Sequence, residues 1–150
     1  MGKVVLFAVL TMDGCLADSS EETRRWLART RRYGITSMKE SARVLNAHTP
    51  LTLLSDWVKG SHSVYLMEAE TATASIINGM IRMRQFDEII LCTIPVIAGN
   101  GCHLFQSRLP ESTWICQKVK TYKNGIVKAI YRRNGSERSC ISIFSEVFRK

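Results

Sequence analysis

A chain of 150 residues with 45% hydrophobic residues is long enough to form one domain with its own core. Its formal charge of +8 favours acidic or phosphate-bearing partners, but no aromatic ladder or nucleic-acid motif accompanies the basic residues, so a nucleic-acid partner is not expected. No apolar run reaches the ~18 residues of a membrane span. Five cysteines without CxxC spacing and three scattered histidines predict reduced thiols, no metal site and a cytoplasmic location.

Strands and helices alternate through the first two-thirds of the chain. The valine-rich run 3–11 predicts a buried first strand rather than an export signal, because its apolar core is short and Asp13 follows. Asp13-Gly14 predicts a turn, and serine and acidic residues at 19–22 predict the start of a helix over 24–32 that ends at Gly34. The following patterns predict a strand over 35–38, a helix over 39–46, strands over 51–54 and 63–67, and a helix over 68–84.

The stretch 86–105, FDEIILCTIPVIAGNGCHLF, carries the strongest local pattern. The six residues at 89–94, apolar except for Thr93, predict a strand buried on both faces, which must end or bulge at Pro95 because proline has no N–H to donate. The glycines of the following Gly99-Asn100-Gly101 loop allow close backbone approach. A buried strand that ends in a glycine-rich loop is where open α/β sheets bind ligands.

The last third of the chain predicts an antiparallel hairpin. Alternating segments at 114–122 and 126–132 flank Asn124-Gly125, which is a strong hairpin-turn signal. A final amphipathic segment over 140–148 fits a strand or a helix. We therefore expect a single α/β domain over residues 1–150, with a mixed, mostly parallel sheet and a C-terminal antiparallel hairpin.

Three segments, in order along the chain, carry a resemblance to the dihydrofolate-reductase-like family. VVLFAVLTMDGCLAD (4–18) resembles the opening strand and turn of that family, FDEIILCTIPVIAGNGCHLF its Asp-Glu strand and Gly-x-Gly block, and VKTYKNGIVKAIYRR (119–133) its closing hairpin. The subgroup resembled most is the C-terminal reductase domain of bifunctional riboflavin-biosynthesis enzymes. The resemblance implies a three-layer α/β/α reductase that binds NADPH and reduces a pteridine- or pyrimidine-type heterocycle, and we expect a homodimer.

The same resemblance implies a set of site residues. Asp13 is the candidate catalytic acid, although an aspartate before Gly14 is at least as readily explained as a turn former. Lys39 and Ser41 would fall at the family's Gly-Arg-x-Thr motif, and Ser55 would approach the adenosine ribose. The residues implied to contact the cofactor are Ala8, Thr11, Gly14, Lys39, Ser41, Ser55, Gly99 and Gly101.

The chain departs from the family pattern at each phosphate-binding position. Methionine and lysine replace the glycine and arginine of the first motif, and Asp56 stands where an arginine often meets the 2′-phosphate. That aspartate would repel the phosphate by about 4 kcal/mol at about 4 Å with an effective dielectric of about 20. Glu68 and Glu70 replace the glycine pair that lets a helix N-terminus receive pyrophosphate. Two functions therefore stay open: a nicotinamide-dependent reductase, or a cofactor-free relative that serves as a binding or scaffold protein.

Overall fold

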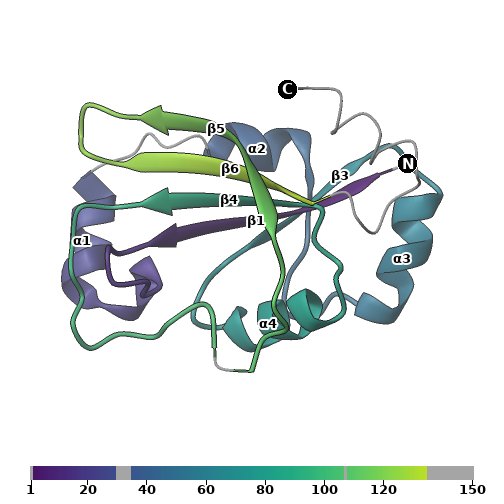
Figure 1. The fold of residues 1–150 in the computed structure, drawn as a ribbon, viewed down its shortest axis with the longest axis horizontal. Helices are drawn as coiled ribbons and strands as arrows, with labels where there is room; N and C mark the ends of the chain where they lie inside the picture. Colours follow the sequence, from purple (N-terminus) through teal and green to yellow (C-terminus); the bar gives the residue numbers. More distant parts are fainter. Residues whose placement is uncertain (1, 30–34, 107, 135–150) are drawn as a thin grey trace.

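The computed structural model describes residues 2–29, 35–106 and 108–134 as a six-stranded sheet with helices on both faces (Figure 1). The strand order is β2-β3-β1-β4-β6-β5. The strands are β1 (Lys3–Leu10), β2 (Arg43–Val44), β3 (Val64–Glu68), β4 (Glu88–Thr93), β5 (Trp114–Thr121) and β6 (Val127–Arg133). The helices are a short 3₁₀ turn (Ala17–Ser19), α1 (Glu21–Arg29), α2 (Ile35–Ser41), α3 (Leu51–Lys59) and α4 (Ala74–Arg82).

Two hydrophobic clusters, one on each face of the sheet, make this a three-layer α/β/α fold. Successive β1 residues alternate between them, so that Leu6 packs toward α3 and α4 while Phe7 packs toward α1 and α2. Both side chains are fully buried. The prediction of a first strand buried on both faces is therefore confirmed.

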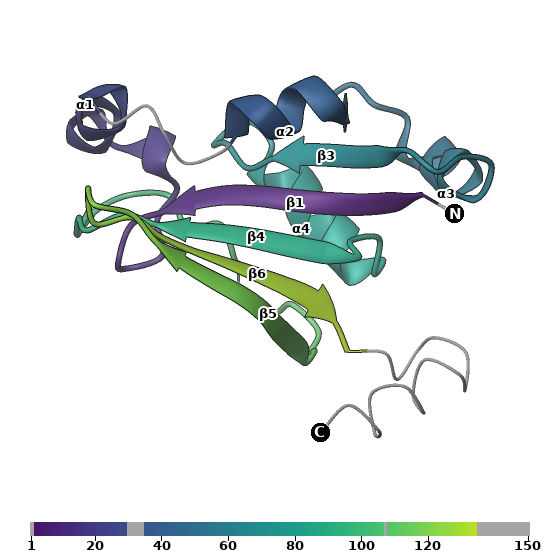
Figure 2. The ribbon, with the colours of Figure 1, turned by 90° about the horizontal axis from the view of Figure 1, so that it is seen from above.

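The pairing of the strands is also as the sequence indicates. β1 runs parallel to β3 and β4, whereas β4, β6 and β5 are antiparallel neighbours. The predicted strands over 63–67 and 89–94 and the predicted hairpin are confirmed. Because β3, β1 and β4 are parallel, their carboxyl ends meet at one edge of the sheet, beside α1 in Figure 1. Viewed from above, α1 and α2 lie beside β3, and the β5–β6 hairpin forms the opposite edge of the sheet (Figure 2).

Two segments predicted as strands are helices. Residues 35–38 belong to α2, and residues 51–54 open α3. In α3 the side chains that pack on the core are Leu51, Leu54 and Val58, a three-to-four spacing that extends beyond the short apolar run used for the strand prediction. The helix predicted over 39–46 ends at Ser41, and Arg43–Val44 forms the short edge strand β2 instead.

The helix predicted over 68–84 starts six residues later than expected. Glu68 completes β3, and α4 begins at Ala74. Thr73 explains the delay, because its hydroxyl donates to the carbonyl of Glu68 at 3.0 Å and accepts from the Glu70 N–H at 2.9 Å. These bonds hold residues 69–73 as a turn before the helix can start.

Three predicted features lie in residues that the structure does not describe. They are the end of the first helix at 30–32, its stop at Gly34 and the segment over 140–148. Within the described part of the chain, no helix is long and apolar enough to cross a membrane.

Candidate functional site at the carboxyl ends of the parallel strands

Asp13 ties the loop after β1 to the loop after β4. Its carboxylate accepts hydrogen bonds from the Thr11 hydroxyl and from the backbone N–H groups of Ala98 (3.1 Å) and Gly99 (2.9 Å). The Thr11 bond first, and then the two backbone bonds, hold the pKa of Asp13 well below its usual range. Asp13 is therefore ionised at neutral pH and holds no proton to donate. These bonds fit the alternative, a structural residue of the turn, and the catalytic role of Asp13 stays a prediction.

Two of the glycines at this end serve internal packing rather than open space for a ligand. Gly14 has a φ of +80°, which the turn after β1 requires. A Cβ at Gly101 would stand 2.8 Å from Ser19 Oγ and 3.1 Å from Cys15 Cβ, so any other residue would force these side chains to move. The same Ser19 hydroxyl accepts from the Cys102 N–H at 3.1 Å. The backbone does approach closely at Gly101, as expected, but it packs against Ser19 and Cys15 of the chain itself.

Two cysteines near the site, Cys15 and Cys92, are packed into the core. Cys15 is fully buried, and its Sγ lies 3.9 Å from His103 Nε2. Burial raises the pKa of Cys92 to about 11, with Lys128 opposing the shift, so this thiol stays protonated at neutral pH. Both side chains act as small core residues.

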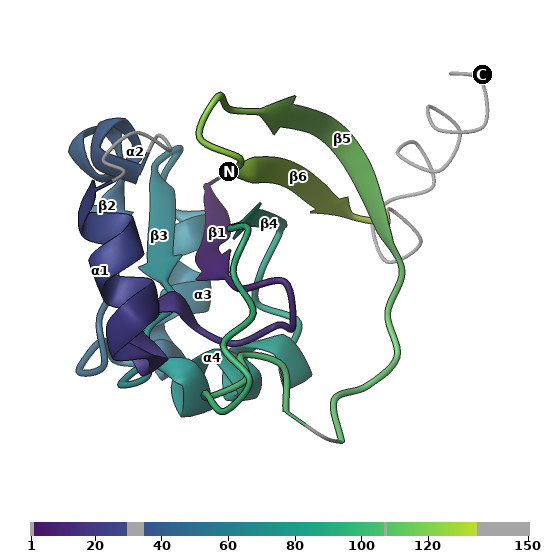
Figure 3. The same cartoon turned by 90° about the vertical axis from the view of Figure 1, so that its left-hand side faces the viewer.

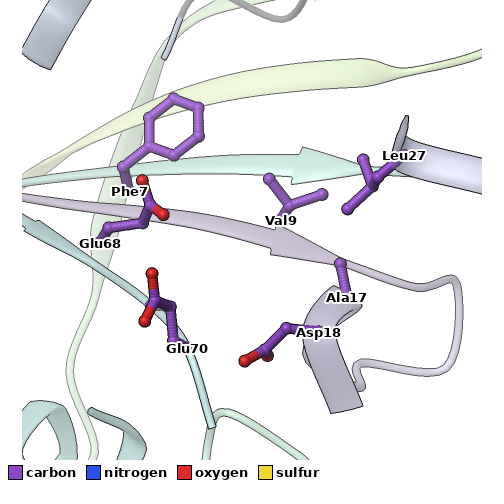
Figure 4. Close-up of a pocket in the computed structure, with 8 residues that line it drawn as sticks. Phe7, Val9, Ala17, Asp18, Leu27, Glu68 and Glu70 are labelled. Atoms are coloured by element: carbon purple, nitrogen blue, oxygen red, sulfur yellow. The ribbon is translucent and has the colours of Figure 1, made fainter. Parts of the chain in front are cut away.

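A pocket of about 120 Å³ opens beside the carboxyl ends of β1 and β3 (Figure 4). Apolar side chains form its walls and three carboxylic acids, Asp18, Glu68 and Glu70, line it from one side, as Figure 4 shows. Its full lining is Phe7, Val9, Ala17, Asp18, Leu27, Glu68, Ala69 and Glu70. Among the described residues, no group of three or more His, Cys, Asp or Glu side chains is arranged to hold a metal ion.

The acids of this pocket are only partly neutralised. Lys39 Nζ lies 2.7 Å from Glu68 Oε2, with the lysine side chain about half exposed. The pKa of Glu70 is raised, first by burial, then by its hydrogen bond with Glu68 and by the negative charges of Glu68 and Asp18, while Lys39 opposes the shift. An anion that enters this pocket would meet the same repulsion that Glu70 does.

Asp18 accepts hydrogen bonds from the turn that precedes α4. Its two carboxylate oxygens accept from the Thr71 N–H at 3.1 and 2.9 Å, and one of them accepts from the Thr71 hydroxyl at 3.1 Å. This turn is where the family resemblance places a glycine pair and a pyrophosphate. The chain's own carboxylate therefore takes a backbone donor that a phosphate would need.

The predicted cofactor residues do not form one site. Thr11, Gly14, Gly99 and Gly101 do meet at the ends of β1 and β4, but Ala8 and Thr11 are buried, at 0% and 2% exposure. Lys39 is paired with Glu68, and the Ser41 hydroxyl donates to the carbonyl of Met38 at 3.3 Å.

Ser55 is placed at the other end of the molecule. It lies on α3, which contacts the start of β1 through the Gly2 N–H to Val58 carbonyl bond (Figure 1). There it lines a separate cavity of about 190 Å³ together with Lys59 and Asp87. The strand predicted to carry Ser55 is a helix, so the structure places Ser55 apart from the other residues of the predicted site.

These residues do not fit NADPH in the pose that the resemblance implies. The pocket is smaller than the roughly 300–1,000 Å³ typical of sites for drug-sized ligands. Asp18 accepts the hydrogen bond of the Thr71 N–H, and Lys39 is already paired with Glu68. Glu68 and Glu70 carry side chains in the turn where the family resemblance places glycines. Sequence reasoning identified Glu68 and Glu70 but missed Asp18. Its partner Thr71 is 53 residues away, and no local pattern connects the two.

Comparison with known proteins gives a likeness of structure without a likeness of sequence. No protein-family model and no curated protein matches this chain. A Shewanella protein described as a riboflavin biosynthesis protein matches with a TM-score of 0.59 and 15% identity, over 88% of this chain and 99% of that one. A pyrimidine reductase-like protein of Corynebacterium diphtheriae matches with a TM-score of 0.56 and 10% identity, over 89% and 92% of the two chains.

A bifunctional protein matches over part of its length. It is the diaminohydroxyphosphoribosylaminopyrimidine deaminase/5-amino-6-(5-phosphoribosylamino)uracil reductase of Thermotoga maritima, with a TM-score of 0.52 and 13% identity, over 89% of this chain and 57% of that one. At these identities the matches establish the fold. The resemblance to dihydrofolate-reductase-like proteins is therefore confirmed: the chain has the α/β fold of riboflavin-biosynthesis and pyrimidine reductase-like proteins.

Proposed function

We propose that this chain uses a reductase-like fold as a binding or scaffold protein and takes no nicotinamide dinucleotide in the usual pose. One observation carries the proposal: the Asp18 carboxylate accepts hydrogen bonds from both donors of Thr71, in the turn before α4. A phosphate in that position would have to displace an anion that belongs to the chain. The neighbouring Glu68 and Glu70 add to the negative charge that it would meet.

Magnitudes favour exclusion of the phosphate over its capture. A helix N-terminus stabilises an anion by about 0.3–1 kcal/mol at an exposed site. A single carboxylate at about 4 Å repels a unit negative charge by about 4 kcal/mol with an effective dielectric of about 20. Solvent reduces the second figure at a partly exposed site, but more than one carboxylate contributes to it here. Lys39, which could offset the charge, is committed to Glu68 at 2.7 Å.

The test is whether the protein carries a nicotinamide cofactor through purification. We expect a protein purified without added nucleotide to show no absorbance in the reduced nicotinamide band and to release no nucleotide on denaturation. A stoichiometric nucleotide in the denatured supernatant would contradict the proposal. A Glu68→Gly/Ala69→Gly variant, which introduces two adjacent glycines into the turn before α4 and removes one carboxylate, provides the matched comparison.

A second candidate is an NAD(P)H-dependent reductase of a pteridine- or pyrimidine-type heterocycle. The fold shared with the reductase-like proteins above favours it, together with the convergence of Thr11, Gly14 and Gly99 at the ends of β1 and β4. Its test is oxidation of NADPH or NADH in the presence of dihydropterin and aminopyrimidinone substrates. Turnover that depends on the heterocycle would support this candidate, and absence of turnover with every pair would remove it.

We further propose that the protein is a cytoplasmic homodimer. The absence of CxxC spacing and the buried thiols of Cys15 and Cys92 fit a reducing compartment. Sedimentation velocity at several concentrations tests the dimer, and a single species at the monomer mass of 17.0 kDa would contradict it.

A further inference from the structure

Three lysines share one face of the β5–β6 hairpin. Lys120 stands directly opposite Lys128 across the two strands, and Lys118 stands opposite Ile130. Residues directly opposite each other project from the same face of a sheet. Ring contacts agree, because the Lys128 ammonium lies 5.9 Å from the centre of the Phe7 ring, and Lys120 lies 4.9 Å from that of Tyr122. Phe7 and Tyr122 belong to the same face of the sheet.

These three lysines lack an ion-pair partner within the described part of the chain. No carboxylate of the described residues forms an ion pair with Lys118, Lys120 or Lys128. The segment 112–134 contains six lysines and arginines and no acidic residue. Like charges directly opposite each other destabilise an antiparallel pair. The hairpin therefore holds an arrangement that is unfavourable by itself and would be relieved by an anionic partner.

Protection of a sheet edge explains only part of this charge. β5 is the outer strand of the sheet, and lysines on an edge strand discourage unwanted pairing. That accounts for Lys118 and Lys120. It does not account for Lys128, which lies on β6, between β4 and β5, where there is no edge to protect.

We propose that an acidic, extended segment of another protein docks along β5 and adds a strand to the sheet. Residues 116–121 of β5 are all exposed, and Figures 2 and 3 show the β5–β6 hairpin at the edge of the sheet that lies farthest from α1 and α2. Carboxylates at every second position of such a segment repeat at about 6.8 Å, which matches the spacing of Lys118 and Lys120. On the opposite face Val119, 57% exposed, offers an apolar contact to the alternate side chains.

A second copy of this chain fits the same edge poorly. Two β5 strands side by side would bring two rows of lysine together without a carboxylate between them. The occupant favoured by the charges is therefore a different chain, with alternating acidic and apolar residues. The inference names a partner for the binding role proposed above and rests on that role.

The experiment is fluorescence anisotropy with a labelled eight-residue peptide of alternating glutamate and valine. We expect saturable binding to the full chain and none with a lysine–valine peptide of the same length. The Lys120→Gln/Lys128→Gln variant should raise the dissociation constant about tenfold, the scale of two partly exposed ion pairs. Lys59→Gln, on α3, is the matched control and should leave it unchanged. A thermal melt of each variant confirms that the hairpin is still folded.

Two further peptides separate strand addition from simple charge attraction. One carries N-methyl groups at its odd positions and the other at its even positions, so that only one of them blocks the backbone donors that face β5. We expect one peptide to bind and the other to fail. Equal binding of both, no binding of the parent peptide, or tighter binding of a single-stranded oligonucleotide would each overturn the inference. NADPH titrated into the same samples tests the proposed function separately, because nucleotide binding would refute that role and leave the peptide result to stand alone.

Discussion

Replacing Asn78 with leucine removes a buried polar side chain that connects α4 to the loop after β4. The Asn78 side chain is fully buried, and its Nδ2 donates to the carbonyls of Ala74 and Leu104, both at 2.7 Å. Its Oδ1 accepts from the Gln106 N–H at 3.1 Å. These bonds fix residues 104–106 on α4, and the same loop carries Gly99 and Gly101 to the end of β1.

The expected cost follows from the groups left behind. Leu104 is fully buried, so its carbonyl would lose a partner that water cannot replace, at about 1–3 kcal/mol. The Gln106 N–H belongs to an exposed residue and can turn to water, so it adds about 0.5–1 kcal/mol at most. Leucine keeps the branching of asparagine at Cγ but is the larger side chain, so overpacking of this buried position adds to the loss. We expect a loss of about 2–4 kcal/mol, or about 4–16 °C in Tm for a chain of this size.

Urea unfolding of Asn78→Leu against the parent chain measures this free energy. Ser75→Ala, at an exposed position of the same helix, is the control and should change the free energy of unfolding by less than about 0.5 kcal/mol. A midpoint for Asn78→Leu within that same range would refute the reasoning, because it would mean that the loop is not held by this side chain.

Three further changes test the electrostatics and packing of the site. The lowered pKa of Asp13 means that its hydrogen bonds stabilise the fold above the unfolded-state pKa of about 3.9, and that this stabilisation is lost as the pH falls through the folded-state pKa. Thermal melts from pH 7 downward should therefore show Asp13→Asn less stable than the parent chain at neutral pH, with the difference closing in acid. Parallel pH curves for the two proteins would contradict this. The raised pKa of Glu70 has the opposite sign, so Glu70→Gln should gain a few tenths of a kcal/mol at neutral pH and lose that gain below about pH 4, whereas a gain that persists in acid would show another cause. Gly101→Ala should cost about 1–3 kcal/mol by chemical unfolding because its Cβ would stand 2.8 Å from Ser19 Oγ, while Gly79→Ala, with nothing within 4 Å, should gain about 0.5–1 kcal/mol; a neutral Gly101→Ala would refute the close packing.

The parts of the fold that the sequence predicts are those with a pattern local to one element. The central strands are runs of buried β-branched residues, and the Asn124-Gly125 turn marks the hairpin. α3 was predicted as a strand because its first four residues are mostly apolar, and only the later Val58 reveals the helical spacing. The late start of α4 depends on Thr73, whose hydroxyl competes with the helix for local backbone partners.

Some contacts of the candidate site could also be predicted from the sequence, and others could not. The meeting of Thr11, Asp13 and Gly99 follows from two parallel neighbouring strands whose carboxyl ends share one edge, so it could be predicted once the strands were known. The bond from Thr71 to Asp18 joins loops 53 residues apart, and the facing of Lys120 and Lys128 depends on the hairpin register. Tertiary geometry alone supplies these contacts, and they decide the electrostatics of both surfaces.

Calorimetric titration of NADPH and NADH into the purified protein tests whether the carboxylates of Asp18, Glu68 and Glu70 exclude the cofactor. We expect no saturable heat up to millimolar nucleotide, because Asp18 holds the Thr71 donors and Glu68 and Glu70 lie beside the turn where the family resemblance places the pyrophosphate. A stoichiometric binding curve with a micromolar dissociation constant would contradict it and would establish that the chain binds the cofactor despite the carboxylates in its path.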